Sequence, residues 1–133
     1  MIRYLSSDNA PKPFSRYSQA VEVGQGARLV FVSGQVGVRA DGSLADTEEG
    51  QHEQAWLNVL EILRSAGLGP REIVDVTAYV TSPAGVPLYR QVRDRMLGGA
   101  EPASTLIVVA GLADPRWSVE IQLVAADTGE RAG

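Results

Sequence analysis

The segment that most constrains the fold is Arg28–Val36, because its sequence RLVFVSGQV is apolar on both alternating faces up to Phe31. A strand of this kind belongs near the centre of a sheet that is covered on both sides. Four further stretches have the alternation or the composition of strands. They are Ser18–Val23, Ile73–Thr81, Ser104–Ala110 and Val119–Ala125. The turn at residues 24–26, Gly-Gln-Gly, predicts a hairpin between the first of them and the strand 28–36.

Two stretches have the periodicity of amphipathic helices. Thr47–Ala66 carries an apolar stripe that includes Trp56, which we expect in the core, and Gly67 suits its C-terminal cap. Pro83–Leu97 is the second helix, and two glycines end it. The order β-β-α-β-α-β-β indicates an α+β, two-layer fold, with a mixed β-sheet and two helices on one face.

Helices on one face leave the other face of the sheet bare. Apolar side chains from three strands would then face water: Leu29 or Val30, Leu106 or Ile107, and Val124. Large exposed apolar surfaces usually mark an interface. We therefore predict that another subunit covers this face, so that the protein is an oligomer.

The composition removes many catalytic mechanisms. The 133-residue chain has no cysteine and a single histidine, His52, so thiol catalysis is excluded and a zinc site is disfavoured. We expect His52 on the solvated surface, and we expect neither a metal nor a cofactor. Lys12 is the only lysine beside eleven arginines, so Schiff-base chemistry would depend on it alone.

The charge and the hydropathy pattern limit the partners. The formal charge is −4, and an acidic chain without a basic block is poorly suited to nucleic acid. No apolar run approaches the roughly 20 residues of a membrane span, and the N-terminus lacks the apolar core of a signal peptide. We expect one domain over residues 1–133 with a frayed tail at 127–133, no nucleic-acid or membrane partner, and a cytoplasmic location.

Glu120 is the first candidate for chemistry. It lies within a predicted strand, on the face opposite the apolar stripe that contains Val119 and Ile121. A carboxylate buried between subunits must be paired or hydrogen-bonded, and partial desolvation of a carboxyl group suits acid–base catalysis. The alternative is a solvated or salt-bridged strand residue, which the sequence by itself favours.

Two other groups of residues have weaker signals. The small residues Ser33 and Gly34 close an apolar strand and would allow a ligand to approach the backbone, although a simple strand end is the alternative. Arg90, Arg93 and Arg95 of the second helix are interpreted as a solvated face, although arginine also binds carboxylates.

The chain resembles the Rid family, the reactive intermediate deaminases that are also called YjgF-like, from about Asn9 to Ala125. The matching segments are residues 9–11, 17–20, 31–35, 51–59, 66–68, 73–77, 102–103 and 119–121, which read NAP, YSQA, FVSGQ, QHEQAWLNV, AGL, IVDVT, PA and VEI. The resemblance implies a chorismate-mutase-like fold and a homotrimer. Strands of three subunits would form a central barrel, with a small-molecule site at each interface.

The resemblance also implies a reaction, the hydrolysis of enamines and imines such as 2-aminoacrylate to a 2-keto acid and ammonia, without a cofactor. The family's glutamate, which positions the attacking water, matches Glu120. Its tyrosine matches Tyr17, and its pocket-lining Ser-Gly pair matches Ser33 and Gly34.

The family's carboxylate-binding arginine is absent, because its Pro-Ala-Arg-Ser motif has Ser104 at the arginine position here. A hydroxyl cannot supply a bidentate cation, so a free 2-imino acid should be a poor substrate. Arg90 falls near a pocket-proximal helix position of the family and is a candidate replacement, with a solvated position as the alternative.

The resemblance therefore predicts an enamine or imine hydrolase, or deaminase, with an altered substrate. The alternative is a non-catalytic trimer with the same fold that binds a small molecule or a protein. The nuclease or translation-inhibitor role of some relatives ranks last, because a trimer would carry a charge of −12, three times −4, and repel phosphate.

Overall fold

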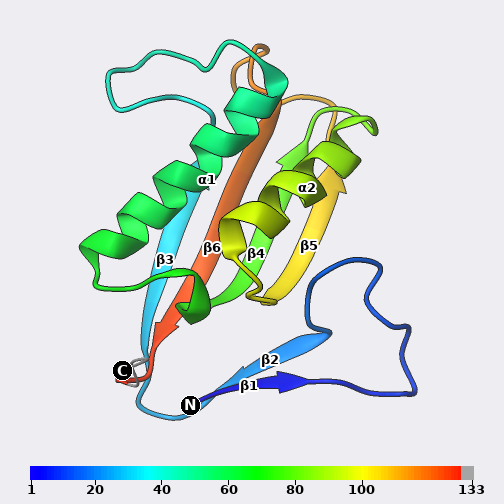
Figure 1. Ribbon diagram of the computed structural model, residues 1–133, viewed down its shortest axis with the longest axis vertical. Coiled ribbons are helices and arrows are strands. Elements are labelled where there is room, and N and C mark those ends of the chain that lie inside the picture. The colour runs from blue at the N-terminus through cyan, green and yellow to red at the C-terminus, as the bar shows by residue number, and fades with distance from the viewer. Residues whose placement is uncertain (130–133) are drawn as a thin grey trace.

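A computed structural model describes residues 1–129 as two layers. Helices α1 and α2 lie side by side over one face of a four-stranded sheet with the strand order β3-β6-β4-β5 (Figure 1). Strands β4 and β5 are parallel and the other neighbours are antiparallel, so the predicted mixed sheet with two helices on one face is confirmed. The prediction that the strand 28–36 lies near the centre of this sheet is wrong. β3 is an edge strand, and its apolar residues on the face without helices are exposed in this chain. The elements of this unit are β3 (Arg28–Gln35), α1 (Glu48–Ser65), the 3₁₀ turn η1 (Pro70–Glu72), β4 (Ile73–Val80), α2 (Gly85–Leu97), β5 (Ala103–Val108) and β6 (Val119–Asp127).

The N-terminal part differs from the prediction. Strand β2 (Ala20–Val23) pairs antiparallel with β1 (Ile2–Leu5) in a separate two-stranded sheet, so the predicted hairpin between residues 18–23 and β3 is wrong. The turn after β2 contains Gly26 at a φ of 83° and turns the chain toward β6 instead of folding it back on β2. The amide of Gly24 donates a 2.9 Å hydrogen bond to the carbonyl of Met1, which closes the end of the small sheet.

The core lies between the helices and the sheet. Trp56 is fully buried there, as predicted, and Val76 of β4 and Ile121 of β6 meet the helices from the sheet. Thr47 caps α1, because its hydroxyl accepts the amide of Gly50 at 2.9 Å. Among residues 1–129, no helix is long and apolar enough to cross a membrane.

Two residues predicted on solvated surfaces are buried. His52 has no exposed surface, and its ring centroid lies 6.1 Å from that of Tyr89. Arg93 is 3% exposed, pairs with Asp94 at 2.9 Å and lies over the Tyr89 ring. The predictions fail because α1 and α2 cover each other's flanks, a contact that the periodicity of a single helix does not show. Arg95 is exposed, as predicted.

Burial has a consequence for the ionisation of His52. Neither ring nitrogen has a hydrogen-bond partner within the described part of the chain. The loss of hydration lowers the pKa of His52 to about 4, from an ordinary value of 6.5. The imidazole is therefore neutral at pH 7.

The sheet face that lacks helices exposes apolar side chains, as predicted. Phe31 is 74% exposed, Leu29 49% and Ile107 39%. The sequence left open whether Leu29 or Val30, and whether Leu106 or Ile107, faces water. Leu29 and Ile107 do, whereas Val30 and Leu106 pack against the core. We call this surface the open face.

The end of the chain is ordered further than expected. Asp127, assigned to the frayed tail, is the last residue of β6 and forms a 2.9 Å ion pair with Arg28 of β3. Residues 130–133 of the predicted tail lie outside the described residues.

Candidate functional site

The candidate site begins at an irregularity in the pairing of β3 with β6. The register shifts between Val32 and Gln35, so that Ser33 and Gly34 together oppose the single residue Gln122. A β-bulge of this kind bends its strand and redirects side chains, and bulges are frequent beside active sites. Both Ser33 and Gly34 are exposed on one chain.

The carboxylate of Glu120 lies against this bulge. A Cβ added to Gly34 would be 2.8 Å from Cδ and 3.0 Å from Cγ of Glu120, closer than side chains approach one another. Glycine at position 34 therefore leaves room for this conformation of Glu120, and a larger residue there would require the end of the Glu120 side chain to move. Because β3 and β6 are adjacent antiparallel strands, the fold brings together two residues that are distant in the sequence.

Glu120 belongs to the open face. It pairs with Tyr79 of β4, while its neighbours Val119 and Ile121 point into the core. The side chain is half-buried, and within residues 1–129 no hydrogen bond or ion pair engages its carboxylate. Of the two alternatives to a catalytic role, a salt-bridged strand residue therefore does not describe it, whereas a solvated strand residue still does. Its oxygens can accept hydrogen bonds from water or a ligand.

The open face has a shallow groove, which Ser33 of the bulge lines and Glu120 does not. Its volume is about 240 Å³, and Phe31 and Val124 form apolar parts of its lining. The polar groups that line it are Ser33, Asp75, Thr77 and Gln122. This surface combines hydrogen-bonding groups with apolar area, but in one chain the groove is smaller than the roughly 300–1,000 Å³ of typical small-molecule sites.

The other predicted site residues lie at a different part of the sheet. The backbone of Ser18 donates to the carbonyl of Pro102 at 3.1 Å, so Tyr17 lies beside the start of β5. The Tyr17 hydroxyl accepts the amide of Phe14 at 3.1 Å. Ser104 pairs with Val76, which faces the helices.

One chain therefore does not assemble all the predicted residues. Ser104 is on β5, and β4 lies between β5 and the strand of Glu120, β6. On β4, Ser104 pairs with Val76 and Glu120 pairs with Tyr79, three residues further along the strand. These offsets separate Ser104 from Glu120 by about 10 Å along the strands and about 10 Å across them. We call Ser33, Gly34 and Glu120 the glutamate half-site, and Tyr17 and Ser104 the tyrosine half-site.

Arg90 is also remote from Glu120, because α2 covers the face of the sheet opposite the open face. It is half-buried, and its Nε is buried without a hydrogen-bond partner in the described chain. No hydrogen bond joins it to Ser104 or Tyr17 within residues 1–129. A role for Arg90 in the site stays a prediction.

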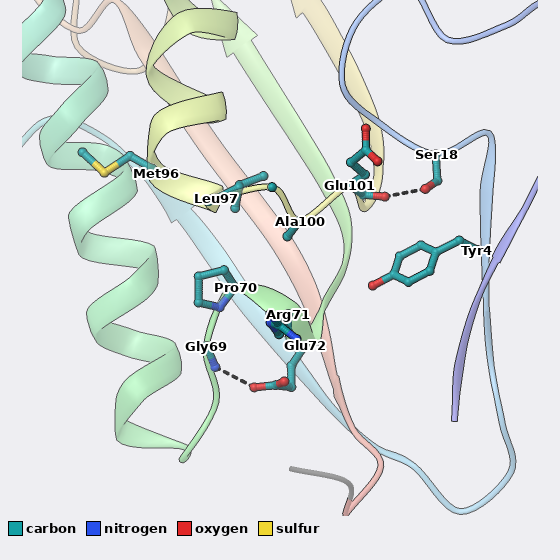
Figure 2. A pocket seen from close by; sticks show the side chains of 12 residues that line it. Tyr4, Ser18, Gly69, Pro70, Arg71, Glu72, Met96, Leu97, Ala100 and Glu101 are labelled. Atoms are coloured by element: carbon teal, nitrogen blue, oxygen red, sulfur yellow. Dashed lines mark hydrogen bonds between the residues drawn. The ribbon is translucent and has the colours of Figure 1, made fainter. Parts of the chain in front are cut away.

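A larger hollow, of about 830 Å³, lies elsewhere. It is bounded by Tyr4 of β1, by η1 and by the C-terminal end of α2 (Figure 2). The hydroxyl of Ser18 donates to the carbonyl of Glu101 on one side of it. None of the predicted site residues lines this hollow, so size alone does not identify the site in one chain.

Comparison with known proteins gives the family. Residues 7–127 match the family model described as Endoribonuclease L-PSP. The chain is 33% identical over 126 residues to Protein DfrA of Myxococcus xanthus, covering 91% of this chain and 92% of the relative. It is 29% identical over 112 residues to a 2-iminobutanoate/2-iminopropanoate deaminase of Dermatophagoides farinae, covering 83% and 85%.

A solved structure supports the same assignment. The Rid protein YyfB of Yersinia pestis, described as of unknown function, has a TM-score of 0.82 and 29% identity, covering 93% of this chain and 97% of that one. The family match, the relatives and the shared fold agree with the order of motifs in the sequence. The chain belongs to the Rid (YjgF-like) family.

Proposed function

We propose that this protein hydrolyses imines or enamines of small molecules at the interfaces of a homotrimer. The observation that carries the proposal is the contact of the Glu120 carboxylate with Gly34 at the bulge on the open face. This contact supports the proposal, because the carboxylate is half-buried, has no hydrogen-bond or ion-pair partner among residues 1–129 and lies beside exposed backbone. Named deaminases among the relatives support this reaction class.

A ring of subunits is proposed because the two half-sites lie apart in one chain, and three subunits are what the resemblance to the Rid family implies. In a two-fold dimer, the same surface patch of both copies forms the interface. When two different patches of neighbouring copies meet instead, each copy can contact the next in the same way, and the copies form a closed ring. Such a ring would bring the glutamate half-site of one chain to the tyrosine half-site of the next. It would also cover Leu29, Phe31 and Ile107, which water now contacts.

In the proposed reaction, water adds to the carbon of a protonated imine, and a C–O bond forms as the C=N double bond becomes single. The Glu120 carboxylate accepts a proton from the water and returns it to the nitrogen. The C–N bond then breaks with its electron pair going to nitrogen, while the hydroxyl group gives its proton to the Glu120 carboxylate or to water and the C=O double bond forms, so that the products are ammonia and a carbonyl compound. An enamine enters the same sequence after it gains a proton on carbon. We propose that Ser33, Gly34 and Tyr17 line the pocket and hold the substrate.

The direct test is release of ammonia and carbonyl product from a panel of imines and enamines generated in situ, including 2-aminoacrylate and 2-iminobutanoate. The wild-type rate must exceed the spontaneous rate for at least one compound. If no compound is hydrolysed faster than in buffer, the alternative of a non-catalytic trimer is favoured. The observation that supports a non-catalytic trimer is the absence of an arginine at position 104, where the family binds the substrate carboxylate.

Ser104→Arg should change the substrate preference. A guanidinium at this position would restore a cation for a carboxylate, so kcat/KM for 2-iminobutanoate should rise by about tenfold. An imine without a carboxylate should show no gain. Gln91→Arg, on the exposed surface of α2, adds the same charge elsewhere and serves as the control. An equal gain in both variants would show that general charge attraction is responsible.

Phe31→Asp should prevent assembly. Phe31 is the most exposed apolar side chain of the open face, and a buried, unpaired carboxylate would oppose the subunit contact. Light scattering should give three times 14.2 kDa for the wild type and a smaller mass for the variant at the same micromolar concentration. Leu57→Asp is the control, because Leu57 is 49% exposed on α1 and should leave the mass unchanged. A monomeric wild type would contradict the proposed trimer.

A further inference from the structure

We infer that Gln51 is a positioning residue for Glu120, and that Asn58 performs the same task for Gly34. The inference rests on the proposed function, because it concerns how the glutamate half-site is held. Both residues belong to α1 and are seven positions apart, which is two helical turns, so they lie on one side of the helix. Each holds a backbone segment next to a half-site residue.

Gln51 holds the segment before β6. Its Nε2 donates to the carbonyl of Arg116 at 3.0 Å. Its Oε1 accepts the amide of Ser118 at 2.8 Å and the hydroxyl of the same residue at 3.0 Å. The side chain is 7% exposed, so water competes little for these bonds. Ser118 is two residues before Glu120, and the bonds therefore fix the point at which the strand carrying the carboxylate begins.

Asn58 holds the segment after β3. Its Nδ2 donates to the carbonyls of Val36 at 3.1 Å and Val38 at 2.8 Å. Its Oδ1 accepts from Nε2 of Gln54 at 2.8 Å, which orients the amide. Val36 is two residues beyond Gly34. Asn58 thus fixes the chain that leaves the bulge, as Gln51 fixes the chain that enters β6.

The two clamps are linked by close packing. A Cβ added to Gly37 would lie 2.6 Å from Cβ of Gln51, so the segment after β3 rests directly on the same helix. Glu120 and Gly34 therefore take their relative position from α1 as well as from the strand pairing. Loss of one clamp should let the carboxylate move relative to the bulge, which affects the chemical step more than substrate binding.

Gln51→Leu tests the inference, with Thr47→Ala as a matched control that weakens the same helix by removing its cap. In the leucine variant kcat should fall about tenfold with KM within twofold, whereas the control should keep both values within twofold. Gln51→Glu retains the acceptor for Ser118 but cannot donate to Arg116, so its kcat should be intermediate. A folded leucine variant with wild-type kcat would overturn the inference.

Hydrogen exchange separates this inference from the proposed function. The Ser118 amide should exchange at least tenfold faster in Gln51→Leu than in the wild type or in Thr47→Ala, because it loses its acceptor. Unchanged exchange would overturn the inference whatever the activity. If the wild type hydrolyses no imine, the proposed function fails, and faster exchange confined to 116–120 would still show that Gln51 holds the start of the Glu120 strand.

Discussion

Glu120→Gln should lower kcat for imine hydrolysis by about 100-fold or more, the usual contribution of a positioned general acid–base group. Glutamine keeps the volume of the side chain and its contact with Gly34, but its amide cannot accept and return a proton near neutral pH. KM should change by less than about threefold if the carboxylate acts mainly in the chemical step. Steady-state ammonia release over a range of substrate concentrations gives both constants.

The control for Glu120→Gln is Glu22→Gln. Glu22 is also a strand carboxylate, but it is exposed, pairs with Arg3 at 3.1 Å and belongs to the separate N-terminal sheet, which contains no residue of either half-site. This variant should retain wild-type kcat and trimer mass. A Glu120→Gln variant that assembles normally and keeps its activity would remove Glu120 from the reaction. Loss of activity in both variants would point to an effect of overall charge.

Acid should weaken the fold through His52. In the folded chain the pKa of His52 is about 4, below its ordinary 6.5, so the unfolded chain binds more protons between these values. The stability that comes from a neutral His52 is therefore complete above pH 6.5 and is lost as the pH falls toward 4. Between pH 7 and pH 4.5 the free energy of unfolding should drop by about 2 kcal/mol from this group.

His52→Leu isolates this effect. Leucine fills a similar space without a titrating group, so its free energy of unfolding should fall by about 2 kcal/mol less than that of the wild type over the same interval. Urea unfolding at pH 7 and pH 4.5 measures the difference, at one protein concentration because unfolding of an assembly depends on concentration. Equal acid sensitivity in the two proteins would show that carboxylates, and not His52, control the loss.

Local patterns predicted the elements of the main unit well. The alternation of Ile73–Thr81 corresponds to β4, and the apolar stripe of residues 47–66 corresponds to α1, because each element buries one face. Strand β1 gave no such signal, since its four residues are half-buried or exposed. The pairing of β2 depends on that strand, which explains why the predicted hairpin with β3 is wrong.

The candidate site was predictable only in part. Glu120 could be selected because it lies on the sheet face that was expected to be covered by another subunit, where a carboxylate must be paired or hydrogen-bonded, and the family resemblance added Tyr17, Ser33 and Gly34. The bulge that brings Gly34 to Glu120 depends on the register between β3 and β6, which no local pattern specifies. Gln51 has the sequence context of a solvated helix residue. Only its hydrogen bonds to the segment before β6 indicate that it positions the strand of Glu120.

The position of β3 at the edge of the main sheet has a consequence for handling the protein. Its outer edge has no neighbouring strand in that sheet, and the adjoining open face carries exposed Phe31. A strand edge next to an apolar surface favours intermolecular β-pairing and aggregation. A mutation that separates the subunits of the proposed trimer would leave this edge and the open face uncovered together, and should therefore reduce solubility as well as activity.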